Sequence, residues 1–272
     1  MKPLSELTLL DRFLFACAME DTWIMQKVLE IILGREMALV DPTQVEKELR
    51  TVPWLRSVRL DVMAFDEEDQ LYNTEVQREN TGNLVRRGRF YQALIDSSLL
   101  EPGDVNFNQM QDTYQIMIAP FDLFGKKRYR YTFQMKCKEE DMWLEDGVTR
   151  IFLNTKGENP QDVNPELVEL LHYFEKTTDE VAADCESERI KELHERIRRI
   201  KTSEEIGVRY MQKWEEMVYA KEEGREEGVA EGKTKGIALT KRVMKLSMEG
   251  LSKADIAKET GASIQEITEI LE

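Results

Sequence analysis

Cysteine and histidine are scarce in this sequence, and their scarcity excludes several kinds of site. The 272 residues include only Cys17, Cys137, Cys185, His172 and His194. Three widely separated cysteines do not suit a disulfide framework. Together with two histidines, they also cannot form the ligand spacing of a zinc site. We therefore expect a reduced, cytoplasmic protein.

Long apolar runs are missing as well. No stretch approaches the roughly eighteen consecutive apolar residues of a membrane-spanning helix. The opening residues MKPLSELTLLDRFLF lack the basic-then-apolar order of a signal peptide. We therefore expect a water-soluble protein that has no membrane partner.

Positive charge is in short supply, because 38 Lys and Arg face 53 Asp and Glu and leave a formal charge of −15. This balance argues against a protein that coats nucleic acid through bulk electrostatics. Locally the balance reverses, since residues 126–138 hold six Lys or Arg and no acid. The candidate DNA contacts are Arg86, Arg89, Lys126, Lys127 and Arg128. Solvated faces that offset the acidic surplus explain these clusters equally well.

The apolar pattern predicts an α/β fold. Residues 5–34 have helical spacing and end at Gly34, a candidate C-cap. SVRLDVMAFD and LYNTEVQRE then alternate as two strands joined by an acidic turn. A helix follows in NLVRRGRFYQALIDSSLL and closes at Pro102-Gly103, before three further strand candidates, TYQIMIAP, RYRYTFQMKC and TRIFLNTKG. This order predicts a mixed sheet core flanked by helices.

The composition changes after Pro160, which predicts a helical C-terminal extension. Asn164 and Pro165 are the expected N-cap and first residue of an amphipathic helix. Residues 180–235 are rich in Glu, Lys and Arg at helical spacing and predict one or two long, solvated helices outside the core. We therefore divide the chain into a core (1–160), a helical extension (161–236) and a small helical tail (237–272).

Glycine recurs every fourth residue within that extension, at Gly224, Gly228, Gly232 and Gly236. Because glycine weakens a helix, two interpretations stay open: close contact with a second helix in a homodimer, or a flexible linker. The tail that follows carries two capping signatures, Ser252 with Asp255 and Ser263 with Glu266, in a helix-turn-helix pattern. Its last helix, SIQEITEILE, has three Glu and no Lys or Arg, which favours packing or oligomerisation over DNA reading.

Polar residues in the predicted hairpin carry the chemistry. If the turn is centred near residue 68, positions whose numbers sum to about 136 face each other, and Asp61 lies opposite Glu75. Gln77 shares the face of Glu75. Two close, half-buried carboxylates repel, and a hard divalent cation such as Mg²⁺ or Mn²⁺ would remove that repulsion. On spacing alone, a solvent-exposed strand face is the somewhat better explanation.

A family resemblance goes further than the spacing. RLDVMAFDEEDQLYNTEVQ, RRGRFYQALIDSSLLEPGD, YQIMIAPFDLFGKKRYRYTF and TRIFLNTKG resemble, in order, the PD-(D/E)xK nuclease family transposases, which include the recombination-promoting nucleases. The likeness runs from about residue 7 to residue 160. It implies a restriction-endonuclease-like core and Mg²⁺-dependent hydrolysis of DNA phosphodiesters, associated with recombination or mobile elements in bacteria.

The resemblance also implies roles for individual residues. Asp61 matches the metal-binding Asp of the family, and Glu75 matches the acid of its E-x-Q form. The carbonyl of Val76 is an additional candidate metal ligand. Gln77 stands where the wider superfamily usually has Lys. A glutamine can orient water by hydrogen bonding, but it cannot supply charge.

Three further residues are implied only as supporting groups. Arg87 and Tyr91 are one helical turn apart in the helix that covers the site in such folds. Asp11 lies on the first helix, where the superfamily sometimes contributes an acid; a plain helix-terminus charge explains it equally well.

Two functions are consistent with the sequence. The first is an Mg²⁺-dependent DNA endonuclease whose partners are DNA and a second copy bound through the C-terminal helices. The second is a nuclease-fold protein of weak or absent catalysis that acts as a binding or dimerisation module. Gln77, the acidic surface and the helical extension favour the second.

Overall fold

The computed structural model describes residues 1–49, 58–59, 61–100, 103 and 105–272, so the predicted turn residue Pro102 lies outside it. The chain divides into two compact units, residues 1–210 and residues 211–272. Among the helices of the described residues, none has the length and apolar character needed to cross a bilayer.

The first unit begins with a 3₁₀ turn, η1 (Leu4–Glu6), and two helices, α1 (Arg12–Met19) and α2 (Thr22–Leu33). The helical segment predicted over residues 5–34 therefore consists of separate helices. Asp11 and Asp21 each accept hydrogen bonds from backbone N–H groups at the start of a helix, and both act as N-caps. Gly34 ends α2 in the left-handed conformation (φ 70°), which confirms the predicted C-cap.

The mixed sheet is confirmed. Among the described residues, six strands lie in the order β1-β4-β5-β6-β8-β7, and β2 and β3 pair separately. Strands β5, β6 and β8 run parallel, and the other neighbours are antiparallel. The bounds are β1 Leu39–Val45, β2 Glu48–Leu49, β3 Val58–Arg59, β4 Val62–Asp66, β5 Leu71–Val76, β6 Thr113–Ala119, β7 Arg130–Phe133 and β8 Val148–Asn154.

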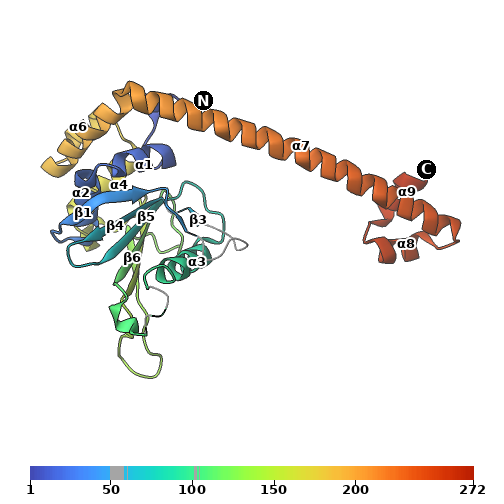
Figure 1. Cartoon of the computed structure of the whole chain (residues 1–272), viewed down its shortest axis with the longest axis horizontal. Helices are drawn as coiled ribbons and strands as arrows, with labels where there is room; N and C mark the ends of the chain where they lie inside the picture. The colour runs from blue at the N-terminus through green and yellow to red at the C-terminus, as the bar shows by residue number, and fades with distance from the viewer. Residues whose placement is uncertain (50–57, 60, 101–102, 104) are drawn as a thin grey trace. The chain divides into compact units, whose positions relative to one another are not determined.

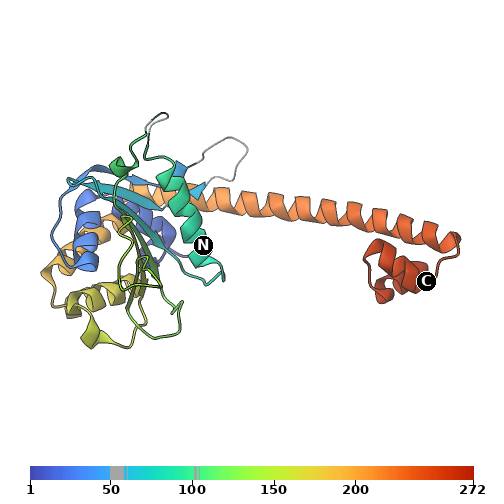
Figure 2. The same ribbon diagram turned by 90° about the horizontal axis from the view of Figure 1, so that it is seen from below.

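The two faces of this sheet have different coverings (Figures 1 and 2). Helices α1, α2, α4 (Pro165–Glu175) and α6 (Glu188–Thr202) lie on one face, and α3 (Leu84–Asp96) lies on the other. The first face holds the large apolar core, to which β6 contributes Ile116 and Ile118. The α3 face holds two smaller clusters, built around Leu71 with Ile95 and around Met117 with Phe152.

The core continues beyond residue 160, where the sequence pattern placed a boundary. Asn164 caps α4 and Pro165 is its first residue, as predicted. After α5 (Asp179–Asp184), α6 buries Ile190, Leu193 and Ile197 completely in the main core. These apolar residues form a single stripe on a helix that is otherwise charged, so composition alone predicted a solvated helix. The remaining 3₁₀ turns are η2 (Phe107–Gln109) and η3 (Pro160–Asp162).

Helix α7 (Glu204–Met248) begins in the first unit and continues through most of the second. Its last turns pack with α8 (Lys253–Thr260) and α9 (Ile264–Leu271) around a small apolar cluster. Ser252 and Ser263 cap α8 and α9, as predicted. The four repeated glycines lie inside α7, and a Cβ on any of them would meet nothing within 4 Å. That segment is helical rather than a frayed linker.

Candidate active site

Two buried carboxylates face each other in the β4–β5 hairpin. Val62 pairs with Thr74 and Met63 with Asn73, which is the register expected from the sequence. Asp61 directly precedes β4 and therefore lies opposite Glu75, the penultimate residue of β5. Each is only 5% exposed. The solvent-exposed strand face that spacing alone favoured is therefore wrong for this pair.

An arginine approaches each carboxylate. Arg12 Nε lies 2.5 Å from Asp61 Oδ1, and Arg87 Nη2 lies 3.7 Å from Glu75 Oε2. Burial, reinforced by the negative charge of Asp61, raises the pKa of Glu75 to about 7. Burial also raises the pKa of Asp61, although Arg12 opposes that shift. The pair therefore binds one proton readily at neutral pH unless a further positive charge enters the site.

Gln77 holds Arg87 at the carboxylate pair. Its Nε2 donates to the carbonyl of Glu79 (2.9 Å), and its Oε1 accepts from Arg87 Nη2 (2.6 Å). The guanidinium lies 5.7 Å from the ring centre of Tyr91, one turn further along α3. The Nε of Arg87 is buried and has no hydrogen-bond partner within the described part of the chain. Arg87 can therefore still donate to an acceptor that enters the site.

The backbone of Val76 points toward Asp61. The N–H of Gln77 donates to the carbonyl of Ile118 on β6 (2.9 Å). Because backbone groups of successive strand residues point to opposite sides, the N–H and carbonyl of Val76 point toward β4. In agreement, the N–H of Val76 donates to the Asp61 carboxylate, which favours the charged form of Asp61. The Val76 carbonyl therefore points to the same side as Asp61.

Asp11 does not join this pair. One of its carboxylate oxygens caps α1 by accepting from Phe13 N (3.0 Å), and the other lies 3.4 Å from Arg78. The structure thus places Asp11 as a helix-terminus charge, the alternative that the sequence left open. The residue that α1 contributes is Arg12, which sequence reasoning missed. No local pattern joins residues 12 and 61, because only the packing of α1 against the sheet brings them together.

The predicted DNA contacts lie around the same edge of the sheet. Arg86 and Arg89 are exposed on α3. Lys126, Lys127 and Arg128 precede β7, whose first residue pairs with Leu153 near the carboxyl end of β8. The site lies at the carboxyl end of β5, which is parallel to β6 and β8. Lys127 and Arg128 already face Glu158 (2.9 Å) and Asp162 (3.1 Å) in exposed ion pairs, which phosphates can replace at little cost.

The donor set fits a hard divalent cation of the magnesium type. No cluster of three or more His, Cys, Asp or Glu able to hold a metal occurs among the described residues. Mg²⁺ does not need such a cluster, since it commonly keeps several waters and binds one or two carboxylates with substrate phosphates. Asp61, Glu75 and the Val76 carbonyl provide that kind of set. The mutual repulsion of the two buried carboxylates is what a cation would relieve.

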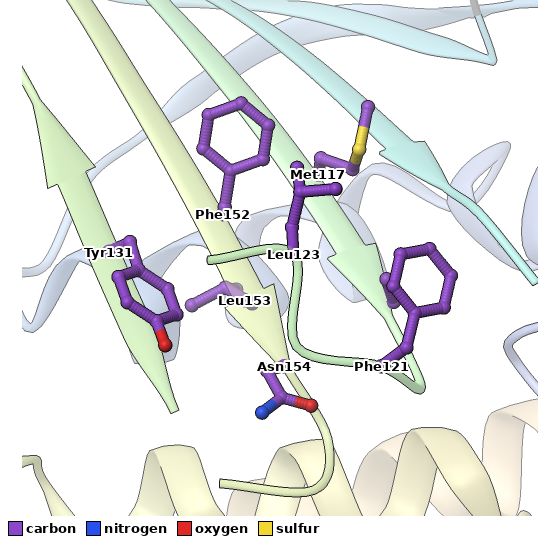
Figure 3. Close-up of a pocket in the computed structure, with 8 residues that line it drawn as sticks. Met117, Phe121, Leu123, Tyr131, Phe152, Leu153 and Asn154 are labelled. Carbon is purple, nitrogen blue, oxygen red and sulfur yellow. The ribbon is translucent and has the colours of Figure 1, made fainter. Parts of the chain in front are cut away.

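A separate hollow near the carboxyl ends of β6 and β8 does not extend the site (Figure 3). Its walls are largely apolar, and they include Met117, Phe152 and Leu153. Its volume is only about 10 Å³, roughly the space that one water molecule needs. We therefore regard it as a packing void rather than a substrate pocket.

Comparison with known protein families gives a match. Residues 12–224 match the sequence profile of a family described as PD-(D/E)XK nuclease family transposase. This range covers more than three quarters of the chain, including the hairpin, α3 and both predicted basic clusters. Searches of curated proteins and of solved structures return no match.

Proposed function

Because the chain belongs to the PD-(D/E)XK nuclease family transposases, we propose that it is a divalent-metal-dependent endonuclease that hydrolyses DNA phosphodiester bonds. A nuclease-like function follows from the family. The metal dependence and the DNA substrate are our proposal, together with an association with recombination or mobile elements. The observation that carries it is the buried pair Asp61–Glu75, in which burial, reinforced by the negative charge of Asp61, raises the pKa of Glu75 to about 7.

Asp61, Glu75 and the carbonyl of Val76 would hold Mg²⁺ or Mn²⁺. When bound, such an ion lowers the pKa of a water molecule and neutralises charge that develops on the scissile phosphate. Burial serves this arrangement because a site of low dielectric strengthens the attraction between carboxylate and cation.

Arg87 and Gln77 supply what a lysine in position 77 would otherwise provide. Gln77 fixes one nitrogen of the guanidinium at 2.6 Å, and the buried Nε has no partner among the residues described. That N–H is free to donate to a phosphate oxygen and to stabilise its negative charge. The positive charge that Gln77 cannot provide would therefore come from Arg87 on α3. Arg86, Arg89 and residues 126–128 would contact phosphates on either side.

Plasmid nicking tests the assignment. Supercoiled DNA is incubated with Mg²⁺ or Mn²⁺ and wild-type protein, Asp61→Asn or Glu75→Gln. We expect the wild type to nick the plasmid, and we expect the nicking rate of both variants to be at least about a hundredfold lower. A loss of that size is typical when an enzyme loses one group that stabilises charge in the transition state. Asp66→Asn is the matched control, because Asp66 is a buried carboxylate (3% exposed) at the other end of β4. Equal nicking by all four proteins, or by none, would refute the assignment.

Metal binding gives a second measurement that does not depend on turnover. Calorimetric titration of the wild type with Mn²⁺ should give a saturable isotherm, and Asp61→Asn and Glu75→Gln should weaken it. If the wild type binds no metal and cuts no DNA, the results favour the alternative function, a nuclease-fold binding module. In that module Arg12 and Arg87 would permanently neutralise the two carboxylates.

We further propose a homodimer formed through the helices of residues 211–272. Apolar side chains of α7 in this unit are exposed, Val229 by 48% and Ile237 by 58%. A second helix would cover them, and the glycines nearby would allow close approach. Sedimentation equilibrium of the full chain tests this: a dimer that Ile237→Glu dissociates supports it, and a monomer at all concentrations contradicts it.

A further inference from the structure

A polar groove lies between α3 and the strands β7 and β8. It encloses about 430 Å³ and takes walls from the later turns of α3, the end of β7 and the start of β8. Its lining includes Arg89, Gln92, Asp96, Phe133, Asp146 and Arg150. It is about forty times larger than the void of Figure 3, and the proposed hydrolysis uses none of these side chains except Arg89.

Two residues that line this groove each carry a buried polar atom without a partner among the described residues. Gln92 is 3% exposed; its Nε2 donates to Asp96 (2.7 Å), and its Oε1 has no partner within the described chain. Reversing the amide would leave a donor unpaired instead. The Nε of Arg150, likewise buried, is also unpaired as far as the structure is described. Because buried polar groups are normally hydrogen-bonded, the groove is suited to a ligand that carries both a donor and an acceptor.

The charges of the groove point to a neutral ligand. Arg89 and Arg150 are offset by Asp96 and Asp146. A phosphate would gain little from such a balanced lining, whereas a neutral group with several hydrogen-bonding atoms would use both signs. The groove therefore differs from the basic residues of the loop before β7, which suit phosphates.

Phe133 adds an aromatic surface. Its ring is held by Phe124 (4.9 Å between centroids) and by Phe152 (5.7 Å), and 44% of the residue remains exposed. A ring fixed in place can stack on a planar ligand without a large loss of side-chain freedom. Stacking on an aromatic side chain is the usual way in which proteins hold unpaired bases.

We propose that this groove binds an unstacked nucleobase, so that the enzyme acts on DNA with a single-stranded stretch beside the cleavage point. The proposal rests on the proposed nuclease function and specifies its substrate. Helix α3 links the two places: Arg87 lies at the carboxylates and Asp96 at the groove, nine residues or about 14 Å apart along the helix. The base would donate to Gln92 Oε1, accept from Arg150 Nε and stack on Phe133.

Binding to a short oligothymidylate tests the base contact. Fluorescence anisotropy in EDTA compares labelled oligothymidylate with an abasic strand of equal length and with a duplex. We expect wild type to prefer oligothymidylate over the abasic strand by about tenfold, the usual size of one stacking contact. Phe133→Leu and Gln92→Met should each remove most of that preference and leave duplex binding unchanged. Phe90→Leu is the matched control, because Phe90 is equally exposed (43%) on α3 but does not line the groove.

The outcomes separate this proposal from the nuclease itself. Plasmid nicking by the wild type, combined with equal binding of abasic and thymidylate strands, overturns the groove and leaves the nuclease. Lack of nicking, combined with a base preference that Phe133→Leu and Gln92→Met both abolish, overturns the nuclease and supports the groove. A preference that both variants retain in folded form, as judged by circular dichroism, overturns the groove as the place of binding.

Discussion

The two faces of the sheet are built from the same strands but satisfy opposite requirements. On the face covered by α1, α2, α4 and α6, successive strands place Ile116 and Ile151 side by side in a continuous apolar core. On the α3 face, the neighbouring positions are Gln115 and Arg150, which pair across β6 and β8. One face thus supplies stability, and the other keeps polar groups in a buried setting where their interactions are strong.

Unpaired polar atoms concentrate on the α3 face. The buried atoms without partners among the described residues include Asn73 Oδ1, Gln115 Oε1, Arg87 Nε and Arg150 Nε. Gly88 allows this crowding, since a Cβ there would lie 2.8 Å from Gln115 Oε1. A purely structural layer would pair such atoms or replace them with apolar groups. Their presence beneath a single helix is one reason why we propose that ligands bind on this side of the sheet.

The largest expected effect separates two neighbouring residues of β6 that face opposite ways. Ile116 is fully buried in the main core, so Ile116→Ala should lower the free energy of unfolding by about 2–5 kcal/mol. Gln115→Met removes the hydrogen bond from Nε2 to the carbonyl of Gly88 (2.9 Å) together with an Oε1 that has no partner among the described residues. Because these two effects oppose each other, the free energy of unfolding should change by less than about 1 kcal/mol. Urea denaturation measures both. A Gln115→Met variant as unstable as Ile116→Ala would mean that the polar layer is structural.

The hairpin and its register are the parts of this arrangement that the sequence predicted best. Strand alternation and a tight turn are local properties, and together they placed Asp61 opposite Glu75. The E-x-Q spacing predicted Gln77 on the strand of Glu75, and the structure places it directly after the last residue of β5. Spacing alone favoured a solvent-exposed strand face. The assignment of a metal-binding nuclease site to these residues therefore came from the family resemblance.

What the sequence did not predict depends on contacts between distant segments. Arg12 pairs with Asp61, almost fifty residues away in the sequence, whereas the neighbouring Asp11 caps α1. The burial of α6 follows from three isoleucine or leucine side chains within a charged helix. The groove beside Phe133 is lined by residues of three separate elements, α3, β7 and β8. The stripe on α6 has a helical period but is narrow within a charged sequence, and the other two features have no local motif.

The next effect concerns the pH dependence of stability in EDTA. The pKa of Glu75 is about 7 in the folded protein and about 4.5 when unfolded, so folding favours the protonated form. Its stabilising contribution is complete below pH 4.5 and is lost as the pH rises through 7, by up to about 3 kcal/mol. Thermal unfolding between pH 5 and pH 8 should show this decline in wild type and a weaker one in Glu75→Gln. Added Mg²⁺ should restore stability at pH 8 in wild type alone. Parallel curves for the two proteins would mean that Glu75 is not strained by its burial.

A double-mutant cycle at Gln77 and Arg87 has a smaller expected effect. Gln77→Lys brings the superfamily's usual residue but places a cation where Arg87 now donates at 2.6 Å. The two charges repel, and we expect nicking to fall about tenfold, in the range of coupling energies between contacting residues. Arg87→Gln alone should also lower nicking, whereas the double variant should recover most of it. Additive losses would show that Arg87 does not replace the missing lysine.

The smallest effect tests the loop before β7, which lies at the same edge of the sheet as the carboxylates. Replacing Lys126, Lys127 and Arg128 with Ala removes only exposed cations, two of them in exposed ion pairs, so the melting temperature should stay the same. Duplex binding should weaken, and the slope of log affinity against log salt should flatten by about one for each phosphate that the loop no longer binds. Lys136→Ala is the control, because Lys136 pairs with Asp141 in the segment after β7, away from that edge. If the control flattens the slope as much as the triple variant, the loop binds no phosphate of its own, and the basic residues of α3 become the only phosphate-binding groups that the proposal retains.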